Sequence, residues 1–166
     1  MRPASGADWF VTVGARSPQR PTRAEYARHL LRAAGRAWRA HVANYSMFNL
    51  STIGERSSVG HIGAQASVIG DGCFVSTFAT LQDLNLRGNV RVRMGDRLAD
   101  SGVPFLGVAL GDGVRLGAGM SIAPGRELPN GVHVVAAGAV GRIPADLAAG
   151  DYNAVDGRLV PAGTEG

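Results

Sequence analysis

Few side chains in this 166-residue chain are of types that carry out covalent or acid-base chemistry. The 17 basic residues are all arginines, which stay protonated in proteins, so Schiff-base formation and lysine general bases are excluded. Cys73 is the only cysteine, which excludes an internal disulfide and favours a reducing, cytoplasmic location. Of the four histidines, only His61 and His133 fall within the repeats described below, too few for a three-histidine zinc site. No metal is therefore expected.

Size and charge narrow the classes of protein further. The mass of 17.2 kDa corresponds to one domain, because two halves would each bury too little apolar surface. Residues 1–49 carry a charge of +6, from eight arginines and two acids, and residues 50–166 carry −2, from nine arginines and eleven acids. Aromatic residues are 6% of the chain and form no stacking platform among the arginines, so a nucleic-acid partner is not expected. Neither a membrane span nor a secretion signal is expected.

The basic N-terminal extension, residues 1–49, contains one predicted helix. Pro21, Thr22 and Glu25 form a capping box that predicts a helix over residues 23–42. This helix would have an apolar face and a basic face on opposite sides. The apolar face consists of Leu30, Leu31, Ala34, Trp38 and Val42. The basic face consists of Arg28, Arg32, Arg36 and Arg39. Two interpretations are open: the apolar face packs on the following domain, which we favour, or the helix contacts a membrane surface or a partner.

From about residue 50 the apolar residues recur every six positions. The positions are Ile69, Val75 and Leu81, and then Leu110, Leu116, Ile122, Leu128, Val134 and Val140. Neither a helix nor an ordinary strand keeps this spacing on one face, so it predicts an all-β solenoid of short parallel strands over residues 50–148. Three faces close a coil of about eighteen residues, giving roughly five coils.

Other residues of the repeats have predicted structural places. Cys73 and Ala79 occupy second, small inward positions, and Asp71 and Asp112 lie in Gly-Asp-Gly corners rather than forming an acid/base pair. His133 precedes an inward valine and is expected to point outward. Residues 149–166 form a tail with a predicted hairpin over residues 151–160, turning at Asp156-Gly157, which covers one end of the solenoid.

Residues 57–142 resemble the hexapeptide-repeat acyltransferases. Within that group, three elements resemble the C-terminal acetyltransferase domain of bifunctional sugar-1-phosphate nucleotidylyltransferases. They are Asn-Leu-Arg-Gly at 85–88, the valine- and arginine-rich stretch through Arg97 with residues 100–102, and Phe-Leu-Gly-Val-Ala-Leu-Gly-Asp-Gly at 105–113. The resemblance implies a left-handed parallel β-helix that forms a homotrimer, with sites between neighbouring subunits.

The resemblance also implies roles for individual residues. In such enzymes a histidine about two dozen residues before the asparagine is the general base, and a cationic residue follows it. His61 precedes Asn85 by 24 residues and Arg91 follows Asn85 by six. His61 would take a proton from the substrate, Asn85 would orient the sugar or stabilise an oxyanion, and Arg91 would hold a phosphate. Arg87, Arg91 and Arg93, with Arg97, line a groove for coenzyme A phosphates or form a solvated loop face.

Two functions of different classes follow. The resemblance implies an acyltransferase that uses acetyl-CoA as co-substrate and acetylates an amino or hydroxyl group of a small acceptor, a sugar phosphate or nucleotide sugar, without a covalent enzyme intermediate. The alternative is a noncatalytic hexapeptide-repeat scaffold that trimerises and docks a partner. In that case His61 is a solvated corner residue and Asn85 only supplies a left-handed corner.

Overall fold

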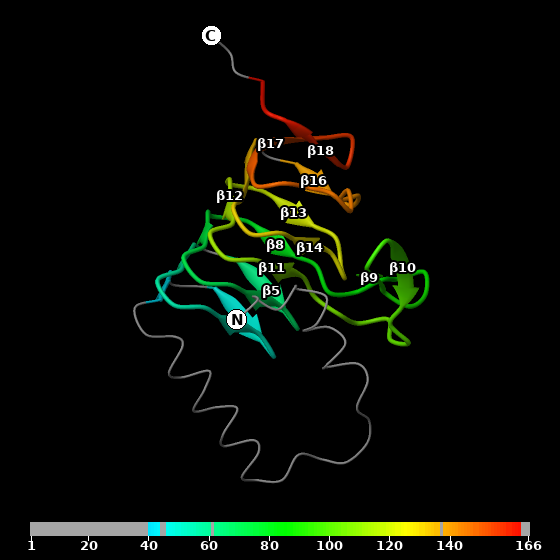
Figure 1. Cartoon of the computed structure of the whole chain (residues 1–166). Coiled ribbons are helices and arrows are strands. Elements are labelled where there is room, and N and C mark those ends of the chain that lie inside the picture. Colours follow the sequence, from blue (N-terminus) through cyan, green and yellow to red (C-terminus); the bar gives the residue numbers. More distant parts are fainter. Residues whose placement is uncertain (1–39, 44–45, 61, 137, 164–166) are drawn as a thin grey trace, which may run out of the picture.

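The computed structural model describes residues 40–43, 46–60, 62–136 and 138–163. These residues form an all-β parallel solenoid of about six turns rather than the five expected (Figure 1). Most of the helix predicted over residues 23–42 lies outside the described residues. The prediction is wrong for its last two residues, because His41 and Val42 form a strand. The described part contains no helix that could cross a membrane.

Each full turn passes through three sheets. The six parallel strands of sheet A are β1 (His41–Val42), β4 (Ser58–Val59), β7 (Phe74–Val75), β12 (Arg115–Leu116), β15 (Val132–Ala136) and β17 (Gly150–Val155). Sheet B consists of β2 (Met47–Asn49), β5 (Gly63–Gln65), β8 (Thr80–Leu81), β13 (Ser121–Ile122) and β16 (Ala139–Val140). Sheet C consists of β3 (Thr52–Ile53), β6 (Val68–Ile69), β11 (Ala109–Leu110) and β14 (Glu127–Leu128). Two strands thus lie before residue 50, the predicted start of the solenoid.

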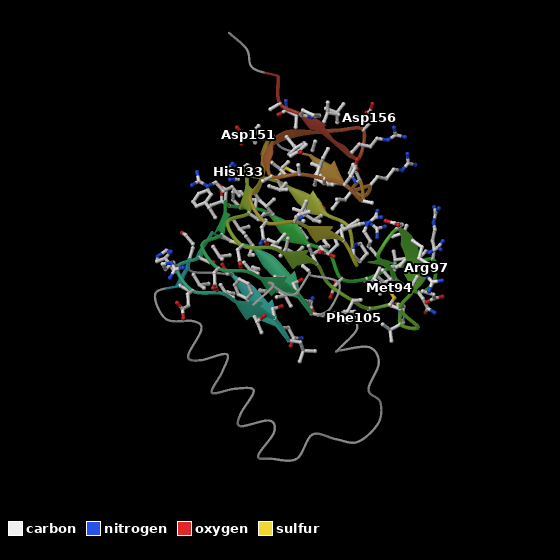
Figure 2. The ribbon with its side chains drawn as sticks, in the orientation of Figure 1. Met94, Arg97, Phe105, His133, Asp151 and Asp156 are labelled. Carbon is white, nitrogen blue, oxygen red and sulfur yellow. The ribbon has the colours of Figure 1, made fainter. Side chains whose placement is uncertain are left out.

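The register of sheet A shows where the turns are regular. Arg115 pairs with His133, and His133 pairs with Asp151, and the sequence separation in each of these steps is 18. Figure 2 shows His133 and Asp151 close together. Phe74, by contrast, pairs with Arg115 across a sequence separation of 41, the same separation as between Asp71 and Asp112. The third turn therefore contains a long insertion, between β8 and β11.

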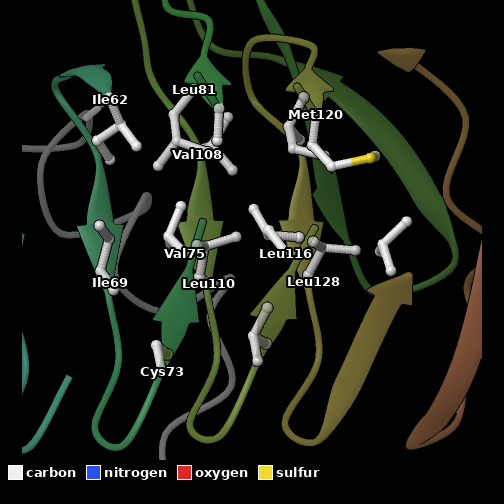
Figure 3. Packing of buried hydrophobic residues seen from close by; sticks show 14 of the residues in the cluster. Ile62, Ile69, Cys73, Val75, Leu81, Val108, Leu110, Leu116, Met120 and Leu128 are labelled. Carbon is white, nitrogen blue, oxygen red and sulfur yellow. The ribbon is translucent and has the colours of Figure 1, made fainter. Parts of the chain in front are cut away.

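The six-residue pattern predicted the core correctly. All nine aliphatics of the pattern are at most 2% exposed and belong to one hydrophobic core cluster, part of which is shown in Figure 3. The second inward position holds Cys73 and Ala79, as expected, and larger residues in the later turns, such as Val114 and Met120. Because the strands of each turn bond to those of the next, the backbone groups are satisfied while the side chains fill the narrow interior.

The Gly-Asp-Gly motifs build one corner of the solenoid. Oδ1 of Asp71 accepts from the backbone N–H of Glu55 at 2.8 Å, and Oδ1 of Asp112 accepts from the N–H of Asp71 at 2.8 Å. Asn130 continues this ladder by accepting from the N–H of Asp112 at 2.9 Å. A Cβ at Gly70 would lie 2.6 Å from Oδ1 of Asp112, so only glycine fits beside the ladder. Asp71 and Asp112 are therefore corner residues, as expected.

The two ends of the solenoid differ. At the C-terminal end β17 turns into the antiparallel strand β18 (Arg158–Pro161), and Leu159 packs on the core with 7% exposure. Asp156 and Gly157 both have positive φ, 48° and 76°, as a two-residue hairpin turn of matching twist requires. In the first turn the inward residue Val42 is 42% exposed, whereas its neighbour in the next turn, Val59, is 1% exposed. The described residues therefore leave the N-terminal end of the core uncovered.

Candidate functional site

The insertion of the third turn, which we call the excursion (residues 83–106), leaves the solenoid at the corner between sheets B and C. It contains the antiparallel pair β9 (Arg91–Met94) and β10 (Arg97–Asp100) and lies beside the solenoid in Figure 1. Val90, Val92 and Leu106 form a small core with Ala109 of β11. A Cβ at Gly125 would clash with Val90 Cγ1. The excursion is thus packed closely on the next turn.

Two arginines tie the excursion to later turns. Arg126 donates from Nε to the carbonyl O of Gly141 at 2.7 Å and from Nη1 to the carbonyl O of Arg91 at 2.9 Å. Arg93 donates from Nη2 to the carbonyl O of Ile143 at 2.9 Å. Burial and, secondarily, the charge of Arg93 lower the pKa of Arg126, so the two guanidinium groups lie near each other. Arg126 was not among the predicted site residues. The repeat length could have indicated it, because position 108 follows the end of the excursion and Arg126 lies one regular turn after position 108.

The predicted site residues have different surroundings. His61 lies outside the described residues. Asn85 serves the excursion itself: Nδ2 donates to the carbonyl O of Asn89 at 2.9 Å, and Oδ1 accepts from the backbone N–H of Arg87 at 3.1 Å. Arg87 is exposed, and Arg91 is exposed and donates from Nη2 to the carbonyl O of Leu98 at 3.1 Å across the hairpin. The guanidinium group of Arg93 thus lies near Arg126 at the junction of excursion and solenoid, whereas Arg91 contacts Arg126 only through its carbonyl O.

A second group of polar residues lies on the outer face of sheet A. His133 points outward, as expected, and its Nδ1 lies 2.9 Å from Oδ1 of Asp151 on the neighbouring strand. An ionised carboxylate only accepts, so Nδ1 carries the hydrogen and Nε2 keeps its lone pair in the neutral ring. The pairing was not predicted, although the sequence separation of one full turn indicates that the two residues are neighbours.

The two groups lie on opposite sides of one chain. In a three-sided coil, the corner between sheets B and C, where the excursion leaves, faces away from sheet A. Figure 2 shows His133 and Asp151 at one edge of the molecule and Met94, Arg97 and Phe105 of the excursion at the other. The arginines of the excursion and the His133–Asp151 pair of the same chain therefore do not share one pocket.

Cys73 is expected to resist thiol reagents. Its side chain is 1% exposed, Sγ donates to the carbonyl O of Gly111 at 3.1 Å, and burial raises its pKa to about 11. At pH 8 only roughly one thiol in a thousand would be ionised, and that fraction is shielded. With the native protein, an aromatic disulfide reagent should release none of its coloured thiolate within minutes; after unfolding in urea it should release one equivalent per chain. Rapid reaction of the native protein would contradict the packing of Cys73.

Neither metal ligation nor sequence similarity assigns an activity. Among the described residues no group of three or more histidine, cysteine, aspartate or glutamate side chains could hold a metal ion. The sequence matches no protein-family model, and no curated protein is significantly similar to it. A functional conclusion therefore depends on the geometry of the solenoid, the excursion and the outer face of sheet A.

Proposed function

We propose that the protein is an acyl-CoA-dependent acyltransferase with a left-handed coil. It transfers an acetyl group from acetyl-CoA to an amino or hydroxyl group of a sugar phosphate or nucleotide sugar. The observation that carries this proposal is the basic junction between excursion and solenoid, where the guanidinium groups of Arg93 and Arg126 lie near each other. Arg91 lies on the adjoining hairpin, and Arg87 is nearby in the sequence. The resemblance of the hexapeptide repeats to those of acyltransferases is the second support.

The junction suits the phosphate groups of coenzyme A. A guanidinium group binds phosphate through parallel N–H donors, and these hydrogen bonds are stronger than those of neutral donors. Arg93 and Arg126 are already oriented by main-chain carbonyl groups, and each keeps N–H donors that these bonds do not use. A ligand would therefore meet two cations whose side chains are largely ordered before binding, which lowers the entropic cost of binding.

In this proposal the chemistry is direct transfer in a cytoplasmic homotrimer. A histidine, for which His61 is the sequence-based candidate, removes a proton from the acceptor, whose nitrogen or oxygen attacks the thioester carbon. Backbone N–H groups and Asn85 stabilise the oxyanion, the C–S bond breaks, and the coenzyme A sulfur receives the proton. Neighbouring subunits supply the rest of each site, which is consistent with the opposite positions of excursion and sheet A in one chain.

Thermal denaturation with acetyl-CoA and with coenzyme A tests the proposal. Saturation at 100 times the dissociation constant should raise the free energy of unfolding by about 2.7 kcal/mol and increase Tm accordingly. Arg93→Gln and Arg126→Gln should reduce this increase. Arg56→Gln should not, because Arg56 lies on a corner, 3.5 Å from Glu55, and forms no part of the junction. An unchanged Tm of the wild type at millimolar concentrations of both ligands would contradict the proposal.

The alternative function is a noncatalytic scaffold for trimerisation and partner docking. One observation favours it: the excursion exposes several large apolar side chains, including Leu86 at 88% and Phe105 at 40%. Exposed apolar groups on a protruding element are typical of protein contact surfaces. A protein that forms a stable oligomer but binds neither acetyl-CoA nor coenzyme A would support this function instead.

A further inference from the structure

The outer face of sheet A carries one column of side chains, one from each turn. In register along the parallel strands they are His41, Ser58, Phe74, Arg115, His133 and Asp151. Neighbouring strands of a sheet lie about 4.8 Å apart, so adjacent members of the column can act on one small ligand. The last three members place a cation, an imidazole and a carboxylate on successive strands.

The imidazole of His133 has the environment of a general base. Asp151 accepts from Nδ1 at 2.9 Å, which holds the ring and directs the lone pair of Nε2 away from the carboxylate. The side chain of His133 is 32% exposed, so a substrate can reach it, while Asp151 is 63% exposed. A carboxylate on the far nitrogen orients the imidazole ring and stabilises the imidazolium ion that forms when Nε2 takes a proton.

Arg115 adds a requirement on the substrate. It is exposed on the strand next to His133, on the side opposite Asp151. The charged groups in register with His133 are therefore Arg115 from β12 and Asp151 from β17. A guanidinium group on the strand next to His133 favours a substrate in which the nucleophile lies near an anionic group, such as a phosphate or a carboxylate.

From this geometry we infer that His133 is the general base of the acyl transfer, in place of His61. Asp151 is its positioning residue, and Arg115 binds the anionic group of the acceptor. This inference rests on the proposed function. Nε2 of His133 takes the proton of the attacking amine or hydroxyl, the new C–N or C–O bond forms as the C–S bond of the thioester breaks, and Nε2 returns the proton to the sulfur of coenzyme A.

The inference is tested by measuring the rate at which free coenzyme A is released, using an aromatic disulfide reagent that reacts with its thiol. Acceptors are hexosamine 1-phosphates and UDP-linked amino sugars, serine as a carboxylate-bearing amine, and glucosamine, which carries no anionic group. His133→Ala should lower kcat by roughly 100-fold or more, and free imidazole should restore part of the rate. Asp151→Asn keeps an oxygen acceptor but removes the charge, so it should lower kcat less, with KM unchanged. Arg115→Gln should raise KM roughly tenfold for the anionic acceptor and leave KM for glucosamine unchanged.

Matched controls separate this role from structure and from His61. His41→Ala removes an exposed histidine from the same column and should leave the rate unchanged. If the wild type turns over while His133→Ala is as fast and His61→Ala is inactive, His133 is not the base but the proposed function stands. If a slow His133→Ala protein melts lower and imidazole restores nothing, the role of His133 is structural and the inference is wrong. If the wild type transfers to no acceptor, the proposed function fails and the inference with it.

Discussion

Gly107→Ala is expected to destabilise the protein by about 3 kcal/mol or more. Gly107 lies where the excursion rejoins the solenoid, and a Cβ there would clash with the carbonyl O of Gln65 and with Oγ of Ser67. It would also lie 2.6 Å from the carbonyl O of Ala66, which already accepts from the N–H of Gly107. Main-chain oxygens of the preceding turn cannot retreat without breaking the ladder, so the strain remains in the folded state.

Urea denaturation of the variant against the wild type measures this loss. Gly63→Ala is the matched control, because a Cβ at Gly63 in sheet B meets nothing within 4 Å and its backbone is not left-handed. Its stability should change little, or rise slightly through the lower entropy of the unfolded chain. A Gly107→Ala protein as stable as the wild type would show that the excursion does not rejoin the solenoid as described.

Leu116→Ala is expected to cost about 2–5 kcal/mol. Leu116 is fully buried in the fourth turn, with Val75 on the strand below and Val134 on the strand above. A solenoid interior has no other layer that could collapse into the gap, because the three sheets are held at a fixed separation by their corners. The loss should therefore lie above the simple transfer free energy of the removed groups.

Thermal and urea unfolding measure this effect, and Leu86→Ala provides the comparison. Leu86 has the same side chain but is 88% exposed on the excursion, so its removal should change stability by less than about 0.5 kcal/mol. Equal effects of the two substitutions would mean that the six-residue pattern does not mark the core.

The core was predictable where the turns are regular. From Leu110 onward the repeat is strict, because each turn consists of three six-residue units, and every predicted aliphatic is buried. Strands β1 and β2 were not predicted, and the six-residue pattern was not identified before Ile69, since the first two turns are shorter than the later ones and their inward positions include small residues such as Ala64. Val42 was assigned to a helix because it also continues an apolar helical face, whereas its partner in the structure is Val59 of the second turn.

The candidate sites depend on register more than on motif. Asp151 is a neighbour of His133 because it lies one regular turn, 18 residues, further along the chain. Arg126 lies the same distance after position 108, where the chain has just left the excursion. Both spacings are visible in the sequence. The folding of the excursion onto the solenoid was not predictable in the same way. Val90 and Arg91 belong to no repeat, and nothing in the sequence indicates that they lie against Gly125 and Arg126 of the next turn.

A structure of the protein with bound coenzyme A would show whether Arg126 and the arginines of the excursion bind the phosphate groups of this ligand. We expect the phosphate groups to contact Arg91, Arg93 or Arg126 near the junction of excursion and solenoid, and the thiol end to approach sheet A of a neighbouring subunit. A coenzyme A molecule bound away from all of these arginines, or a junction that stays empty at millimolar coenzyme A, would contradict this expectation.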